Sequence, residues 1–407
     1  MKEIILVLGI LVMFSCSKTE NQSTISNPVV SQPSAPTTST IVSKNYLQTS
    51  YELQKTNVNI DLMAFRAKLG INSGWNILPV AFLDVNGDGN DDIFYVPSYG
   101  TPDRTDGQLF IYKNGDYVLD NSYFTSTPSL VAARKAIVGD YNNDKMPDIF
   151  IAATGYDVAP FSGEYNELLL SNSNKKYNLV KFSERSSFYH GASSGDIDND
   201  GDLDIFVIGK PDSYFLINDG KGNFTYSTSQ LDISTLFDQF TCELIDIDKD
   251  GFLDLIMGGN EFIVNNTTRI YWGSSSYKYS SNNMTNIPVV QNWGVITDLD
   301  IYDLDNDGIN EVIVTRSGGR VNDFTYYYSG WYIQVSKLNN RIASDVTGTM
   351  IENNFYNQTV INNQEWIPWM RFDDYDNNGK IDFISTKCTN LPFMRWELRN
   401  GKLIKVN

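Results

Sequence analysis

The chain has 407 residues and a formal net charge of −18. This charge excludes nucleic acid and anionic membrane surfaces as partners, because both require a cationic protein face. Hydrophobic residues make up 41% of the chain but fall in short runs, and beyond the N-terminus none approaches the ~20 apolar residues of a membrane-spanning helix. We therefore expect the mature part of the chain to be water-soluble.

Residues 1–15 have the pattern of a signal peptide that precedes a lipidated cysteine. An unbroken apolar stretch from Ile4 to Phe14 is followed by Ser15 and Cys16. The four residues that end at Cys16 resemble a bacterial lipobox, in which the cysteine becomes the first mature residue and carries the lipid. Phe14 is not the commonest residue at its position, so ordinary secretion is the alternative. The pattern predicts an exported protein whose only membrane contact is a lipid anchor in the cell envelope, with the outer membrane favoured and a periplasmic or surface-exposed position open.

The next segments divide the chain into a tether and a folded part. Residues 16–43 hold the lipidated cysteine and a Ser, Thr and Pro tether too polar to bury a core. Residues 44–74 form an N-terminal lead-in, and residues 75–407 form the folded domain. Cys242 and Cys388 lie near different repeats, so we expect no structural disulfide and look for another stabilising device.

Six acidic segments of nine residues recur along the folded domain. They span residues 84–92, 140–148, 196–204, 246–254, 303–311 and 374–382, and their starts are 50 to 71 residues apart. Carboxylates or amides stand at positions 1, 3, 5 and 9. Glycine stands at position 6 in all but the second copy, where Lys145 replaces it. The regular recurrence indicates one structural unit per interval.

The oxygen-rich pattern predicts one calcium ion per loop, up to six in all, with a structural role. Calcium takes six to eight oxygen ligands in flexible geometry, whereas soft metals prefer Cys or His, and the chain has a single His. Position 7 adds a backbone carbonyl. The expected ligands are Asp84, Asn86, Asp88, Asn90, Asp92, Asp140, Asn142, Asp144, Met146, Asp148, Asp196, Asp198, Asp200, Asp202, Asp204, Asp246, Asp248, Asp250, Phe252, Asp254, Asp303, Asp305, Asp307, Ile309, Glu311, Asp374, Asp376, Asn378, Lys380 and Asp382.

Two simpler interpretations explain the loops less well. Asp, Asn and Gly are common in surface turns, but ordinary turns do not place acids at the same offsets six times. An EF-hand needs a bidentate Glu at position 12 between helices. Position 12 is occupied by Tyr95, Ile151, Val207, Met257, Val314 and Ser385, and the flanks read as buried strands.

The loops with their apolar flanks resemble the FG-GAP and VCBS-type repeats of calcium-binding propellers, including the integrin α-subunit head, over about residues 75–407. The resemblance implies β-propeller blades with calcium in a hairpin loop. The tripeptides that name FG-GAP are not evident. Lys145 in the second loop and Asn378 in the sixth depart from the pattern, so these two sites are expected to be the weakest.

The repeat predicts an all-β propeller of four-stranded blades. Each unit reads as a strand, the acidic loop, an apolar strand, a variable loop and a second hairpin. Six blades are favoured, and seven are possible if residues 44–74 supply another. Antiparallel order puts the acidic loops and the second hairpins on one face. The long variable segments 97–107, 154–166, 316–330 and 345–366 then lie on the opposite face, where binding is expected.

The sequence predicts a non-enzymatic binding module for a glycan or protein ligand, because no catalytic motif accompanies the loops. Tyr327 and Trp331 are the candidate ligand-binding rings, although aromatic residues also fill strands. The alternative is a polysaccharide lyase or glycoside hydrolase on the same scaffold, an idea that rests on fold analogy. His190, Arg316 and Arg320 are the candidates for its base and cation, and core packing is the competing interpretation of His190.

Overall fold

The computed structural model describes residues 80–97, 103–156, 162–183, 185–210, 212–233, 238–318, 328–356, 366–373, 380–386 and 394–406. Several predictions lie outside this range. They are the signal peptide, the tether, the lead-in, Cys16, Asp374, Asp376, Asn378, Arg320, Tyr327 and Cys388. Among the described residues no helix has the length and apolar character needed to cross a bilayer.

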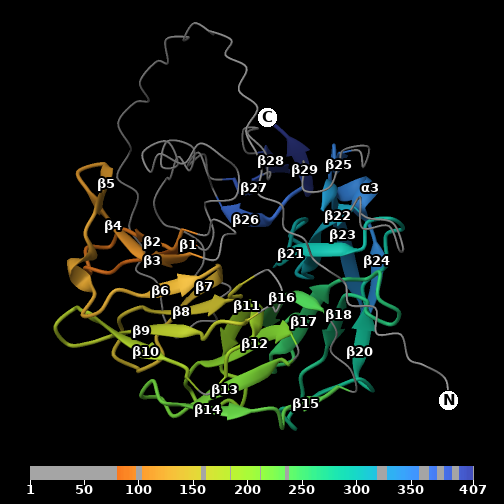
Figure 1. The fold of residues 1–407 in the computed structure, drawn as a ribbon. Helices are drawn as coiled ribbons and strands as arrows, with labels where there is room; N and C mark the ends of the chain where they lie inside the picture. Colours follow the sequence, from red (N-terminus) through yellow and green to blue (C-terminus); the bar gives the residue numbers. More distant parts are fainter. Residues whose placement is uncertain are drawn as a thin grey trace, which may run out of the picture.

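Most of the described strands form six antiparallel sheets arranged around a central axis, which confirms the predicted six-bladed propeller (Figure 1). Blade 1 consists of β1 (Val80–Leu83), β2 (Asp92–Tyr95), β4 (Gln108–Lys113) and β5 (Asp116–Leu119). Blade 2 consists of β7 (Ala133–Gly139), β8 (Asp148–Ala153), β9 (Glu167–Ser171) and β10 (Tyr177–Lys181). Blade 3 consists of β11 (Phe188–Gly195), β12 (Asp204–Lys210), β13 (Tyr214–Asn218) and β14 (Phe224–Ser227).

The second half of the ring repeats this order. Blade 4 consists of β16 (Gln239–Ile245), β17 (Asp254–Gly259), β18 (Arg269–Tyr271) and β20 (Met284–Asn286). Blade 5 consists of β21 (Val295–Tyr302), β22 (Glu311–Gly318), β23 (Ser329–Asn339) and β24 (Ile342–Asp345), and β25 (Phe355–Tyr356) pairs with the start of β23. Blade 6 consists of β26 (Trp369–Asp373), β27 (Asp382–Thr386), β28 (Met394–Arg399) and β29 (Lys402–Lys405).

Short elements lie between the blades. β3 (Arg104–Asp106) pairs antiparallel with β6 (Ser129–Val131), and β15 (Leu231–Asp232) pairs parallel with β19 (Tyr279–Ser280). One turn of 3-10 helix, η1, covers Asn121–Tyr123, and the single-turn helix α3 covers Thr347–Met350. These elements connect blades without adding a layer to the ring.

The core lies between neighbouring blades, because the second strand of a blade is buried on both faces. Every residue of β8 and β17 is buried, so these strands read as continuous apolar runs with an acid only at the first position. One apolar cluster joins blades 1 and 2, another joins blades 2 and 3, and a third joins blades 3 and 4. The largest cluster spans blades 4 to 6. Blade packing therefore accounts for the apolar strands that flank the acidic loops.

The ring closes between the last blade and the first. The Arg371 guanidinium of β26 lies 3.9 Å from the ring centroid of Phe82 in β1, a cation–π contact.

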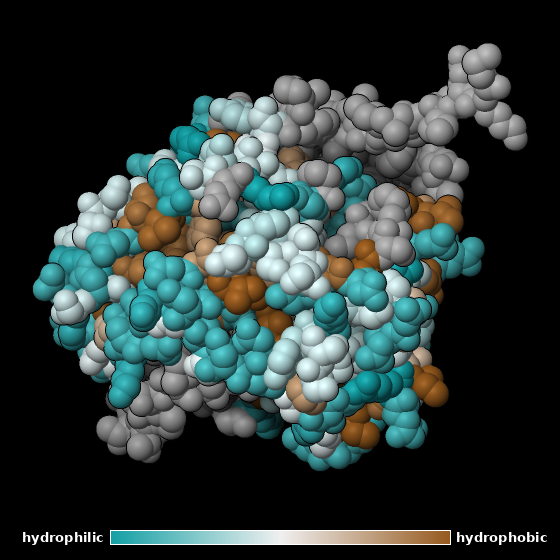
Figure 2. All heavy atoms as spheres, turned by 90° about the horizontal axis from the view of Figure 1, so that it is seen from below, coloured by the Kyte–Doolittle hydropathy of each residue, from teal (hydrophilic) through white to brown (hydrophobic). Residues whose placement is uncertain are grey.

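Seen from below, the molecule shows apolar residues in patches separated by hydrophilic ones (Figure 2). Among the described residues in this view, the apolar patches do not join into one surface.

Charged side chains on the inner strands connect blades across the axis. The Lys135 Nζ of β7 lies 3.4 Å from the Glu243 Oε1 of β16, and Ser193 Oγ of β11 donates to Glu243 Oε2 at 2.9 Å. Asp298 of β21 accepts from Thr241 Oγ1 at 3.3 Å and from the Met370 N–H at 3.0 Å. Two buried carboxylates thus join five of the six blades.

The mutation Glu243→Ala tests this axial connection. It removes the carboxylate nearest to the partly buried Lys135 ammonium, so we expect a loss of about 1.5–3 kcal/mol in the free energy of unfolding, measured by urea denaturation. Replacing both charges, in Lys135→Met with Glu243→Leu, should cost less because no unpaired charge remains. A loss below about 1 kcal/mol for Glu243→Ala would show that the pair is not a stabilising contact.

Candidate metal centres

Each described acidic loop connects the first and second strands of a blade, as predicted. The second hairpins lie on the same face, because hairpin residues contact the loops. Lys175 Nζ, between β9 and β10, donates to the Asn86 carbonyl of the first loop at 2.7 Å. Asn143 Nδ2 of the second loop donates to the Gly220 carbonyl, between β13 and β14, at 3.1 Å. The hairpin of one blade therefore lies on the loop of the preceding blade.

The Asp at position 1 organises the loop backbone in the same way in all five loops that are described in full. In the third loop, Asp196 Oδ1 accepts the N–H of position 5 and Asp196 Oδ2 accepts the N–H of position 6, both at 3.0 Å. Asp84, Asp140, Asp246 and Asp303 accept the corresponding pairs at 2.8 to 3.1 Å. These bonds fold the loop around its first carboxylate.

Positions 4 and 6 adopt left-handed backbone conformations, and this is the reason for glycine at position 6. Gly201 has φ of +98° and Asn199 has φ of +57°. Lys145 adopts φ of +70° at position 6 of the second loop, where a side chain costs roughly 1 kcal/mol relative to glycine. The second loop thus keeps the common geometry at the cost of backbone strain.

The carboxylate at position 9 fastens the loop to the blade. Asp204 Oδ2 accepts the Ile197 N–H at 3.1 Å, and Asp204 Oδ1 accepts the Asn218 N–H of β13 at 2.8 Å. Asp92, Asp148 and Asp254 each make the same pair of bonds. Sequence reasoning assigned position 9 to the metal alone and missed this structural role, because the strand-three N–H lies 14 residues away.

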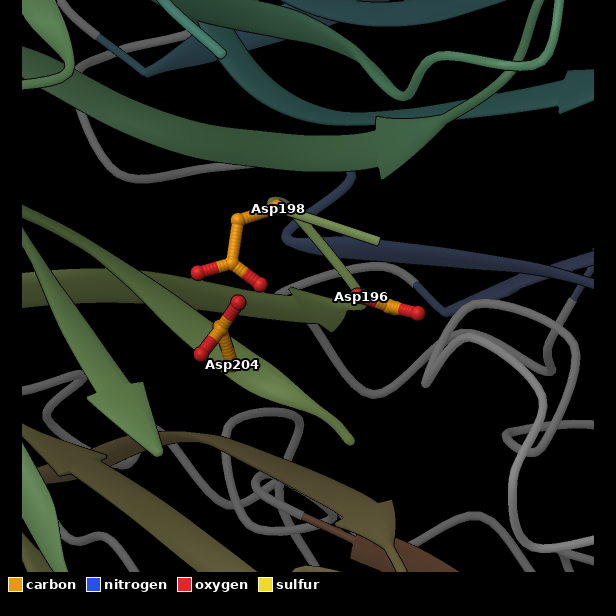
Figure 3. A group of neighbouring side chains, drawn as sticks. All are labelled: Asp196, Asp198 and Asp204. Atoms are coloured by element: carbon orange, nitrogen blue, oxygen red, sulfur yellow. The ribbon is translucent and has the colours of Figure 1, made fainter. Parts of the chain in front are cut away.

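Among the residues that the structure describes, three groups of acids each bring their oxygens within 4.8 Å of one another. They are Asp196 with Asp198 and Asp204, Asp246 with Asp248 and Asp250, and Asp303 with Asp305 and Glu311. Figure 3 shows the first group, in which the carboxylates of Asp198 and Asp204 face each other. Two oxygens bound to one calcium at about 2.3–2.6 Å can lie up to about 5 Å apart, so the spacing fits this ion.

Buried polar atoms of the third loop lack a partner that the protein itself supplies. Asp198 Oδ1 and Asp202 Oδ1 are buried and accept no hydrogen bond, and the Asp202 side chain is almost fully buried. A buried carboxylate oxygen without a donor is unfavourable, and a bound cation removes the penalty. The all-oxygen donor set and these two atoms therefore fit a hard divalent ion.

Burial and mutual repulsion raise the pKa of the loop carboxyls. Burial is the main cause that raises the pKa of Asp204 to about 7 and of Asp148 to about 8. Burial, followed by the charge of Asp200, raises the pKa of Asp202 to about 6. Ionisation of Asp202 and Asp204 is therefore less favourable than that of free carboxyls when no cation is bound, and a bound dication would reverse these shifts.

The other candidate residues lie away from the loops. Trp331 is 2% exposed and packs edge-on against Trp396 in the core, so its ring is not presented to a surface ligand. Arg316 is buried in an ion pair with Glu261 at 2.6 Å. Its guanidinium also donates to Gln334 Oε1 at 2.9 Å, which leaves it facing core groups and not solvent.

His190 lies at a β-bulge near the start of an inner strand, on the face opposite the loops. Its ring centroid is 5.0 Å from those of Phe188 and Phe240. Burial between these rings, together with the charge of Arg134, lowers the pKa of His190 to about 3. The first strands of blades 2, 4 and 5 have a β-bulge at the equivalent position, so a packing role accounts for the place of His190.

A pair of mutations in the third loop separates framework from metal ligation. Asp204→Ala removes the acceptor of two buried N–H groups, so we expect a loss of about 2–5 kcal/mol in unfolding free energy with or without calcium. Asp198→Ala removes a carboxylate that the charges of Asp196 and Asp200 repel in the metal-free protein. It should be neutral or stabilising without calcium and destabilising with it.

Thermal denaturation of both variants, metal-stripped and calcium-loaded, checks this expectation. Equal effects of Asp198→Ala in the two conditions would mean that its carboxylate contacts no ion.

The comparisons with known proteins agree with this geometry. The family model of the FG-GAP-like repeat matches residues 84–151, 140–207 and 196–257, each match running from one acidic loop into the next. The chain thus contains FG-GAP-like repeats that form the propeller. The fifth loop lies beyond these matches, and its backbone bonds at Asp303 place it with the other four.

The chain is similar to several solved structures at low sequence identity. An Agrocybe aegerita lectin that recognises non-reducing terminal N-acetylglucosamine is 14% identical with a TM-score of 0.46, over 81% of this chain and 79% of the lectin. The rhamnogalacturonan lyase YesW is 12% identical with a TM-score of 0.37, over 80% of this chain and 61% of the lyase. A Bacillus licheniformis rhamnogalacturonan lyase is 12% identical with a TM-score of 0.33, over 82% and 72%. No curated protein sequence matches the chain.

Proposed function

We propose that this FG-GAP-like propeller binds calcium in its acidic loops and uses the opposite face to bind a glycan or protein ligand, without catalysing a reaction. The observation that carries the calcium part is the third loop. Its carboxylates converge within 4.8 Å, and two of its buried oxygens have no donor from the protein. Calcium would supply the positive charge that the loop lacks, and up to six ions would serve a structural role.

The opposite face has the exposed side chains expected of a binding surface. The loops that follow each second strand, and those that lead to the next blade, lie on this face. Among the described residues they carry these exposed apolar side chains: Tyr156, Tyr165, Val264, Val289 and Phe355. Aromatic rings held by loops over a rigid ring of blades suit stacking against sugar rings or packing against a partner protein.

The proposal includes a cellular location for the protein. A lipid on Cys16 and the polar tether that follows it would hold the propeller at the bacterial cell envelope, with the ligand-binding face free to meet glycans or proteins there. The lyase or hydrolase alternative gains no support from the described residues. Arg316 is buried in an ion pair, and His190 is packed between two rings.

Removal of calcium tests the first part of the proposal. In metal-free protein the loop carboxylates repel one another without compensation, so we expect the melting temperature to fall markedly in EDTA and to recover on addition of excess calcium. Magnesium at the same concentration should recover less, because its stricter octahedral geometry fits the loops poorly. An unchanged melting temperature in EDTA would contradict the calcium assignment.

Matched surface variants test the second part on a glycan array and against acidic polysaccharides. Phe355 is 59% exposed on the opposite face, and Ile342 is 70% exposed on the loop face. Phe355→Ser or Tyr165→Ser should weaken binding of a captured glycan roughly tenfold, the usual loss for a buried aromatic contact, while Ile342→Ser should not. New ultraviolet absorbance from an acidic polysaccharide would instead indicate lyase activity.

A further inference from the structure

The β23–β24 hairpin of blade 5 brings two cations to two acidic loops. Lys337 of β23 directs its ammonium into the fifth loop. Its Nζ lies 2.6 Å from Asp305 Oδ2, 2.7 Å from Asp307 Oδ2 and 3.3 Å from Glu311 Oε1. These three acids occupy positions 3, 5 and 9, so the ammonium contacts most of the carboxylates that a calcium ion would need.

Arg341, in the turn of the same hairpin, reaches the fourth loop of the preceding blade. Its Nε lies 2.6 Å from Asp248 Oδ2 and its Nη2 lies 2.8 Å from Asp250 Oδ2. The guanidinium also lies 4.7 Å from the ring centroid of Trp272. Arg341 contacts positions 3 and 5 but not Asp254 at position 9, so it covers the fourth loop from outside.

The third loop has no such cation. Continuing the β12–β13 register by one residue places Ile217 opposite Asp204, whereas the β22–β23 register places Lys337 opposite Glu311. Both side chains are half-buried. In the described part of the chain, no ion pair with a lysine or arginine involves the third loop, which also holds a fifth acid, Asp202. The residue opposite position 9 is Ile217 in blade 3 and Lys337 in blade 5. This one difference leaves the negative charge of the third loop without a lysine, whereas the fifth loop has one.

We propose that Lys337 is an internal cation of the fifth loop that competes with calcium, so that the propeller binds calcium with graded affinity, tightly at the third loop and weakly at the fifth. The inference rests on the proposed calcium function. The lysine ammonium and a calcium ion cannot bind the same oxygens at once, because two cations about 4 Å apart repel each other strongly at a protein surface. Calcium can enter only when the flexible lysine stem swings the ammonium into water.

The competition has a consequence for the ring. When calcium is scarce, the lysine neutralises part of the fifth loop and keeps blade 5 folded, while the third loop retains its ion. The fifth loop then fills only at higher calcium. Blade 6 lies against this loop, since a Cβ at Gly401 would lie 3.0 Å from the Asp305 Cβ. Calcium binding to the fifth loop would thus alter the contact between blades 5 and 6.

The variant Lys337→Ile tests the proposal, because it gives blade 5 the residue that blade 3 has. Calcium titration of the full-length protein by calorimetry, with native mass spectrometry to count bound ions, should show one site tightened by at least about tenfold. The variant with Asp305→Asn added should lose this gain, which assigns the tightened site to the fifth loop. Lys337→Arg should bind calcium like the unmodified protein.

The reciprocal variant Ile217→Lys provides the matched control. It introduces an ammonium beside the third loop and should weaken one tight site by a similar factor. Circular dichroism and thermal melting at saturating calcium establish that each variant is folded. If the unmodified protein binds calcium and Lys337→Ile leaves every site within twofold, the competition is refuted while the calcium function stands. If the unmodified protein binds no calcium, both proposals fail.

Discussion

The structure depends on carboxylates that are held close together by the backbone they organise. In each described loop the acid at position 1 accepts two N–H groups of its own loop. The acid at position 9 accepts one N–H of the loop and, in blades 1 to 4, one from the third strand or from a residue just after it. These neutral donors fix the positions of the carboxylates but supply no full positive charge. The hydrogen bonds that shape the turn therefore also hold several negative charges close together. A bound cation would neutralise these charges.

This local chemistry is coupled to the assembly of the ring. Hairpin residues of one blade touch the loop of the blade before it, as Lys175 does with Asn86 and Arg341 does with Asp248. A charge placed in one loop thus acts on the contact between two blades. Near the axis, Glu243 and Asp298 also connect blades, because each accepts a hydrogen bond from a side chain of another blade. The ring is held by apolar packing between blades and by polar contacts at its loop face and its centre.

The repeated features could be predicted from the sequence. The period of the acidic loops and the apolar runs after them gave six four-stranded blades and placed loops and hairpins on one face. Single residues that act across the fold could not be predicted, because their partners lie far along the chain. Lys135 and Glu243 are separated by 108 residues, and Arg341 and Asp248 by 93. Lys337 reads as an ordinary strand residue until the register places it opposite Glu311.

The candidate ligand residues show the same limit. Trp331 lies in an aromatic run that suits either a sugar platform or a core. Its burial against Trp396 depends on the packing of blade 6 against blade 5, which no local pattern predicts. Arg316 has the charge of a substrate anchor, yet Glu261 binds it in the interior. Burial decided both cases, and burial of one residue in a ring depends on the neighbouring blade.

The most direct measurement is diffraction from crystals grown in calcium, with data collected at a wavelength where calcium scatters anomalously. The account predicts an anomalous peak in the third loop, about 2.3–2.6 Å from oxygens of Asp196, Asp198 and Asp204. A third loop with no peak, while its carboxylates keep their positions, would contradict the claim that the repeated loops are calcium sites.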